Sequence, residues 1–199
     1  LTLILGAALL VRLALAPLWA RLPNGLTDEG FWKHWMQKID EHGVLNIFRT
    51  LIRVPDAFRA FNWWGGYVLN RNSLSPRDRE IVILRTGWLC KSGYEWTQHH
   101  RIGLEAGLNA EDIERIKAGA GADGWTAAER TLIAATDDLN RDHFVSNPCW
   151  AELSKHYSER QCMDVVFTAG QYTQVSMILN SFGIQLDPGQ TLDPDLKAF

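Results

Sequence analysis

Residues 75–102, SPRDREIVILRTGWLCKSGYEWTQHHRI, contain two helix start signals separated by a short turn. Ser75 followed by Pro76 is an N-cap with proline at the first helical position, where its fixed φ suits the helix. Ser92 followed by Glu95 has the spacing of a capping box, in which two side chains bind free backbone amides reciprocally. The stretch therefore predicts two helices that fold back on each other as an antiparallel pair.

Similar helix start signals recur along the rest of the chain. They stand at Pro55, Asn109, Thr126, Asn147 and Ser158. Large apolar residues also follow helical spacing over 27–41 and over 158–182. No stretch alternates apolar and polar residues for long, which argues against strands. The predicted fold class is therefore all-α, a helical bundle with the antiparallel pair at its centre.

The chain divides into three predicted parts. They are an apolar N-terminal extension (1–25), a helical domain (26–188) and a loose C-terminal tail (189–199). Residues 1–20 are almost wholly apolar, and three interpretations of them stay open: a packed helix or non-native extension, an export signal or membrane anchor, or an interfacial helix. Arg12 near the centre would make spanning a bilayer costly, by about 2.5–3.5 kcal/mol.

Composition limits the partners and the compartment. The 199 residues carry a net charge of −3, so no basic surplus exists for a phosphate backbone, and we expect no nucleic-acid partner. The three cysteines, Cys90, Cys149 and Cys162, form no Cys-x-x-Cys pair and no zinc-type set, so we expect no metal site. Separated cysteines in odd number favour reduced thiols and a cytoplasmic protein, with membrane contact only if residues 1–20 anchor it.

Large aromatic residues are numerous. Nine tryptophans and the hydrophobic segment 167–182 exceed what one small domain easily buries. We therefore expect a homo-oligomer, and a sedimentation mass of a single chain would contradict this.

The densest polar set lies in the antiparallel pair. Ser92, Glu95 and His99 fall on one helix face, and Glu80 meets that face if the two helices fold back. A carboxylate beside an imidazole favours its protonated form, which suits a general acid or base. The alternatives are structural: capping for Ser92 and Glu95, an ion pair of Glu80 with Arg77 or Arg79, and a satisfied buried imidazole for His99.

The same residues resemble a known family. The resemblance rests on Arg79-Glu80, Tyr94-Glu95-Trp96, His99, Gly103 and Gly107-Leu108, and it extends over about 45–188. The chain is similar to the carboxymuconolactone decarboxylase-like family, which also contains the alkylhydroperoxidase D type. The resemblance implies an AhpD-like bundle that assembles as a dimer, trimer or hexamer, and a decarboxylase branch that uses no cofactor.

The chain departs from the peroxidase members of that family. Those members share a glutamate, a Cys-x-x-Cys pair and a histidine four residues after the second cysteine. Glu80 and His99 hold the glutamate and histidine positions, but Ser92 and Glu95 stand where the cysteines would be. Without a dithiol, peroxidase chemistry is not expected.

We therefore predict a lyase acting on a small unsaturated carboxylic acid or lactone. The predicted catalytic residues are His99, Glu80 and Glu95. The predicted substrate-binding residues are Ser92 on the same face, Arg85 or Arg101 for a carboxylate, and Tyr94, Trp96, Trp63 and Trp64 for an apolar wall. The alternatives are an alkylhydroperoxidase-type antioxidant protein, in which distant cysteines meet in the fold, and a non-catalytic oligomeric ligand-binding protein.

Overall fold

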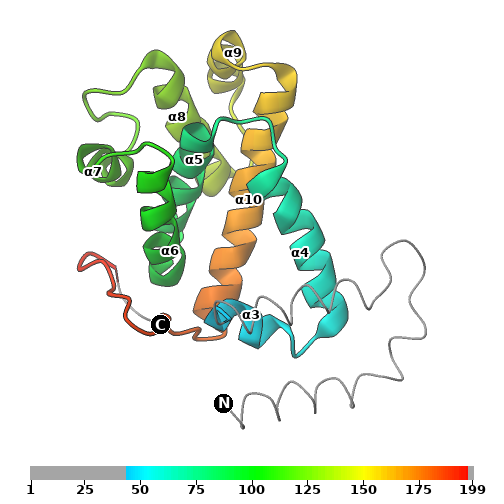
Figure 1. The fold of residues 1–199 in the computed structure, drawn as a ribbon. Helices are drawn as coiled ribbons and strands as arrows, with labels where there is room; N and C mark the ends of the chain where they lie inside the picture. The colour runs from blue at the N-terminus through cyan, green and yellow to red at the C-terminus, as the bar shows by residue number, and fades with distance from the viewer. Residues whose placement is uncertain (1–43, 197–199) are drawn as a thin grey trace. The chain divides into compact units, whose positions relative to one another are not determined.

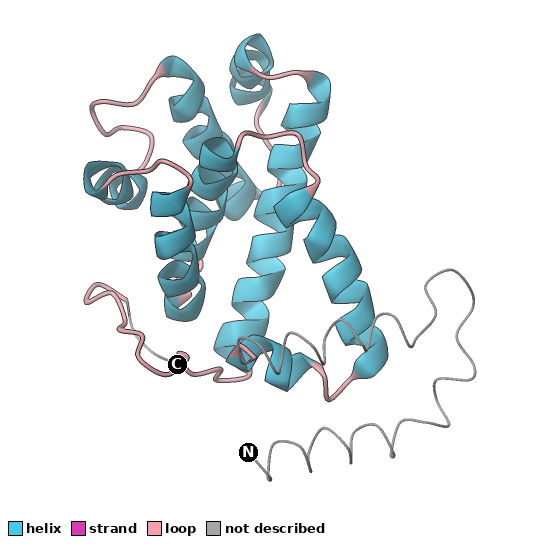
Figure 2. Ribbon diagram, viewed as in Figure 1, coloured by secondary structure: helices cyan, strands magenta, loops and turns pink. Residues whose placement is uncertain are grey.

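The structure is a computed structural model that describes residues 44–196. Over this range helices are joined by turns and loops, and no strand occurs among the described residues (Figure 2). The all-α prediction is confirmed. The apolar segment 1–20 and the helix predicted at 27–41 lie outside the described residues.

The helices begin and end close to the predicted signals. In chain order they are α3 (Asn46–Leu51), α4 (Pro55–Asn70), α5 (Pro76–Leu89), α6 (Gly93–Glu105), α7 (Ala110–Ala118), α8 (Ala127–Asp142), α9 (Asn147–His156) and α10 (Glu159–Ser181). The side chains of Ser75, Asn109, Thr126 and Ser158 each accept a hydrogen bond from the backbone of the helix that follows.

Helix α5 lies at the centre of the bundle, packed against α6, α8 and α10 (Figure 1). All residues from Glu80 to Gly87 are buried, so this helix has no solvent face over two turns. A tight turn, in which Lys91 has a φ of 53°, leads into α6. Contacts of Glu80 with His99 and of Gly87 with Glu95 show that α5 and α6 run antiparallel, as predicted.

The capping box predicted at Ser92 is wrong. Ser92 is the N-cap residue of α6, but its side chain makes no capping hydrogen bond. Glu95 does not reach back to the Ser92 amide, because its carboxylate lies beside the imidazole of His99 one turn later. A local pattern typical of a cap is therefore overridden by a tertiary contact.

The segment after α10 lies on the helices as far as it is described. Asp187 accepts hydrogen bonds from Tyr94 Oη at 2.6 Å and from Gln98 Nε2 at 2.8 Å. Asp193 accepts from the indole of Trp96 at 3.0 Å. Residues 189–196, within the tail that was expected to be loose, therefore include a side chain bound to the core of α6.

The outward face of α10 is partly apolar. Met163 and Met177 are exposed there together with Gln174, and Phe182 is exposed just after the helix. This face is compatible with the homo-oligomer expected from the sequence, which stays a prediction. None of the helices in the described range is both long and apolar enough to cross a membrane.

Candidate active site

Glu80 and His99 form a buried pair between α5 and α6. Glu80 has no exposed surface, and its Oε2 lies 2.6 Å from His99 Nδ1. His99 is 6% exposed. The fold-back of the two helices therefore brings together the residues that the sequence analysis placed on facing helices.

Glu95 approaches the other nitrogen of the same imidazole. Its Oε1 lies 3.1 Å from His99 Nε2, which is within ion-pair distance. The same oxygen is buried and accepts no hydrogen bond, so the contact is a close approach of charges without hydrogen-bond alignment. Glu80, His99 and Glu95 thus form a continuous line, which we call the carboxylate–histidine line, and its Glu95 end has an unused acceptor.

A glycine lets Glu95 come this close to α5. A methyl group added at Gly87 would lie 3.4 Å from Glu95 Cγ, at van der Waals contact. Any side chain larger than alanine at Gly87 would therefore displace the carboxylate from its place beside His99.

Tyr172 of α10 covers the imidazole. Its ring meets the His99 ring edge-on, with centroids 4.9 Å apart and an interplanar angle of 82°. Burial, reinforced by the charges of Glu95 and Glu80, raises the pKa of the Tyr172 hydroxyl well above its ordinary value. Tyr172 therefore stays protonated and closes the line on the α10 side.

The surroundings of the carboxylate–histidine line favour the protonated forms of Glu95 and His99. Burial raises the pKa of Glu95 from 4.5 to about 7, although His99 opposes this shift. Burial alone would lower the pKa of His99, but Glu95 and Glu80 raise it by more. A carboxyl group with a pKa near neutrality in contact with an imidazole is typical of acid–base sites.

These shifts predict a pH dependence of stability. Between pH 4.5 and about 7 the folded state binds more protons at Glu95 than the unfolded chain does, and His99 adds to this above pH 6.5. The free energy of unfolding should therefore fall as the pH rises from 5 to 8, with a slope of up to about 1.4 kcal/mol per pH unit for each of the two groups. Urea unfolding at four pH values checks this, and a flat or rising curve would contradict it.

Two serine hydroxyls are buried on the helices that form the site. Within residues 44–196, Ser92 Oγ at the N-cap of α6 and Ser176 Oγ on α10 make no hydrogen bond of standard geometry. Ser176 lies one turn after Tyr172 on α10 and beside the thiol of Cys90. Burial, with a smaller effect of the negative charge of Glu95, raises the pKa of that thiol. Because buried polar groups are normally hydrogen-bonded, these hydroxyls fit a site that accepts an oxygen of a ligand.

Sequence reasoning missed Tyr172 and Ser176, and it gave Arg79 only as a structural ion-pair partner of Glu80. Arg79 Nε lies 3.2 Å from Glu80 Oε1, so it adjoins the line at the end opposite Glu95. The ion pair with Glu80 that the sequence analysis named as an alternative is therefore present. The two α10 residues carried no signal, because they come from a distant part of the chain.

Tyr94 and Trp96 have structural partners. Tyr94 is bound to Asp187, and Trp96 is bound to Asp193 and 2% exposed. Both side chains therefore fix the segment after α10 against α6.

The structure gives Arg85 and Arg101 other roles than carboxylate binding. Arg85 donates to Asp137 and to the carbonyls of Ile116 and Lys117, which ties α5 to α7 and α8. Arg101 is exposed and pairs with Glu105. Neither guanidinium is brought to the carboxylate–histidine line.

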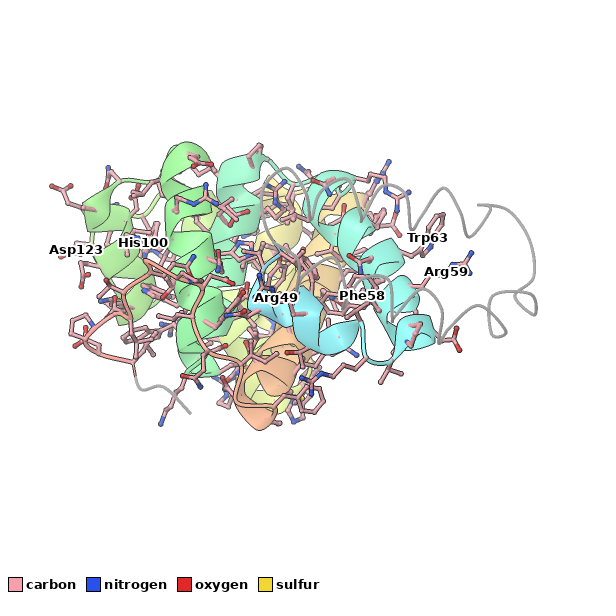
Figure 3. All side chains as sticks on the ribbon, turned by 60° about the horizontal axis from the view of Figure 1, so that its bottom comes forward. Arg49, Phe58, Arg59, Trp63, His100 and Asp123 are labelled. Atoms are coloured by element: carbon pink, nitrogen blue, oxygen red, sulfur yellow. The ribbon has the colours of Figure 1, made fainter. Side chains whose placement is uncertain are left out.

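Trp63 and Trp64 belong to the outer surface of α4. Trp63 is 64% exposed at the surface of the molecule (Figure 3). The guanidinium of Arg71 lies 5.2 Å from the centre of its ring. Trp64 stacks on Tyr67 and meets Phe167 edge-on. The aromatic residue that packs against His99 is therefore Tyr172, and within residues 44–196 neither of the two predicted tryptophans makes a ring contact with His99.

Comparison with known proteins gives one family and one fold. The model of the carboxymuconolactone decarboxylase family matches residues 55–138. No curated protein matches the chain. Among solved structures, an alkylhydroperoxidase AhpD core protein of Ralstonia eutropha JMP134, described as peroxidase-related and uncharacterized, has a TM-score of 0.70 at 19% identity, covering 85% of this chain and 89% of its own.

Two further structures are similar. An uncharacterized peroxidase-related protein of Silicibacter sp. TM1040 has a TM-score of 0.68 at 14% identity, covering 88% of this chain and 92% of its own. The debrominase Bmp8, solved with 2,3,4-tribromopyrrole, has a TM-score of 0.67 at 13% identity, covering 83% and 90%. At these identities the likeness establishes the AhpD-like fold.

Proposed function

Since this chain belongs to the carboxymuconolactone decarboxylase family through residues 55–138, we propose that it is a cofactor-free lyase that removes CO2 from a small unsaturated carboxylic acid or lactone. The observation that carries this proposal is the buried carboxylate–histidine line. It ends at Glu95, whose pKa of about 7 makes it a proton donor and acceptor at neutral pH.

The proposed reaction needs one proton and no redox partner. The bond between carbon and the departing carboxylate breaks, and its electron pair moves into the conjugated carbonyl to give an enolate. Glu95 then gives its proton to carbon, and the carbonyl re-forms as the electron pair returns to bind that proton. Glu95 regains a proton from His99, while Glu80 stabilises the imidazolium.

The enolate oxygen also requires donors. Ser92 and Ser176 offer two buried hydroxyls that have no oxygen or nitrogen partner among the described residues. Donors already in place when negative charge develops stabilise a transition state more than mobile water does. This supports an active site in which the ligand oxygen completes the hydrogen bonds of these two serines.

Turnover of γ-carboxymuconolactone in D2O tests the proposal. We expect release of CO2 and a product that carries one deuterium on carbon, because the proton comes from a group that exchanges with solvent. Tight binding without CO2 release would favour the alternative of a non-catalytic ligand-binding protein. Neither binding nor release would direct the search to other unsaturated acids.

The peroxidase alternative is suggested by the peroxidase-related neighbours but is not favoured by the thiols. The pKa of each cysteine is raised by burial, to about 11 for Cys149, so none is activated as a thiolate. We expect that peroxide treatment forms no intramolecular disulfide. Intact-mass and peptide mass spectrometry would show one as a loss of two hydrogens linking two of these cysteines, and that result would overturn the assignment.

A further inference from the structure

Arg79 is a largely buried cation with most of its hydrogen-bonding capacity unused. Its side chain is 16% exposed, and within residues 44–196 it bonds one group, the Oε1 atom of Glu80, through Nε. The other Glu80 oxygen is bound to His99. A guanidinium has five N–H donors, so four of those of Arg79 have no acceptor from the described protein.

Comparable cations elsewhere in the fold have several partners each. Arg85, whose side chain is 10% exposed, makes three hydrogen bonds to a carboxylate and two carbonyls. Lys117, at 11%, pairs with three carboxylates. Arg79 therefore has a partly exposed guanidinium whose terminal nitrogens can bind an acceptor that the described residues do not supply.

The surroundings of Arg79 place that acceptor at the candidate active site. Arg79 is separated from His99 by the single carboxylate of Glu80. Tyr172 packs on His99. Burial raises the pKa of its hydroxyl, the charges of Glu95 and Glu80 add to this, and the charge of Arg79 opposes it. A ligand held on Arg79 would therefore lie at the Glu80 end of the carboxylate–histidine line.

We infer that the terminal nitrogens of Arg79 bind a carboxylate of the substrate and hold it at the Glu80 end of the carboxylate–histidine line. This rests on the proposed function for the role of Glu95. Arginine binds a carboxylate through two parallel hydrogen bonds, which fixes orientation as well as affinity. Arg79 takes the role that the sequence had suggested for Arg85 or Arg101.

Calorimetric titration with cis,cis-muconate and with its dimethyl ester tests the inference on the whole chain. The wild type should bind the dicarboxylate and should bind the ester about tenfold more weakly or worse. Arg79→Gln should weaken muconate binding by a similar factor and remove the preference over the ester. Arg101→Gln, which changes an exposed arginine, is the matched control and should bind like the wild type.

Arg79→Lys is a second variant that keeps the positive charge beside Glu80. It allows the test to be made even if Arg79→Gln does not fold. It should bind muconate more weakly than the wild type, because an ammonium group lacks the two-pronged geometry. Wild-type affinity in the folded Arg79→Lys and Arg79→Gln variants would overturn the inference, as would equal binding of acid and ester. Loss of muconate binding in Arg79→Gln, with no CO2 release by the wild type, would overturn the proposed lyase reaction and support this site.

Discussion

Replacing Glu95 by glutamine should lower kcat for CO2 release by about 100-fold or more and leave the fold intact. Glutamine has nearly the same shape and fits between Gly87 and His99, but its amide cannot give a proton to carbon. Initial rates of CO2 release from γ-carboxymuconolactone, with circular dichroism of both proteins, measure the two parts of this expectation.

The pH profile provides a second signature of Glu95. Because its pKa is about 7 and the protonated form is the donor, kcat of the wild type should fall as the pH rises above 7. The residual activity of Glu95→Gln should not show this limb. Glu105→Gln, at an exposed position of the same helix, is the control and should keep the wild-type rate and profile. A Glu95→Gln enzyme as active as this control would remove Glu95 from the mechanism.

Replacing Glu80 by alanine should destabilise the protein by about 3–5 kcal/mol. Glu80 is fully buried and bonds both His99 and Arg79, so its loss leaves two buried cationic groups without their shared partner. It also creates a cavity in the most buried part of α5. The free energy of unfolding in urea at pH 6 measures the effect.

A matched variant shows whether the loss of stability in Glu80→Ala exceeds that expected from losing any ion pair. Glu114 pairs with Lys117, but its side chain is 69% exposed, so Glu114→Ala should have a small fraction of the effect. If Glu80→Ala unfolded as easily as the wild type, Glu80 would not be the anchor of the carboxylate–histidine line.

The helices could be predicted from the sequence because their signals are local. Asn109, Thr126 and Ser158 each cap the helix that directly follows, so a few neighbouring residues contain the information. The pairing of Glu80 with His99 was also accessible, since it requires two helices and a short turn. The Ser92 capping box was wrong because the preferred partner of Glu95, His99, lies on the next turn.

The remaining site residues depend on long-range packing. Tyr172 and Ser176 reach the site only because α10 packs against α5 and α6, and no pattern near His99 announces them. Arg85 was assigned to substrate because its partners, Asp137 and two α7 carbonyls, lie far along the chain. Charge and residue type alone do not distinguish an arginine that ties helices together from one that is left for a ligand.

The most direct test of the account compares CO2 release from γ-carboxymuconolactone by the purified wild type and by His99→Ala. The account predicts release by the wild type and a rate lower by about 100-fold or more in the variant, because Glu95 loses the imidazole that returns its proton. Release at the wild-type rate by a folded His99→Ala protein would contradict the central claim that the carboxylate–histidine line performs the chemistry.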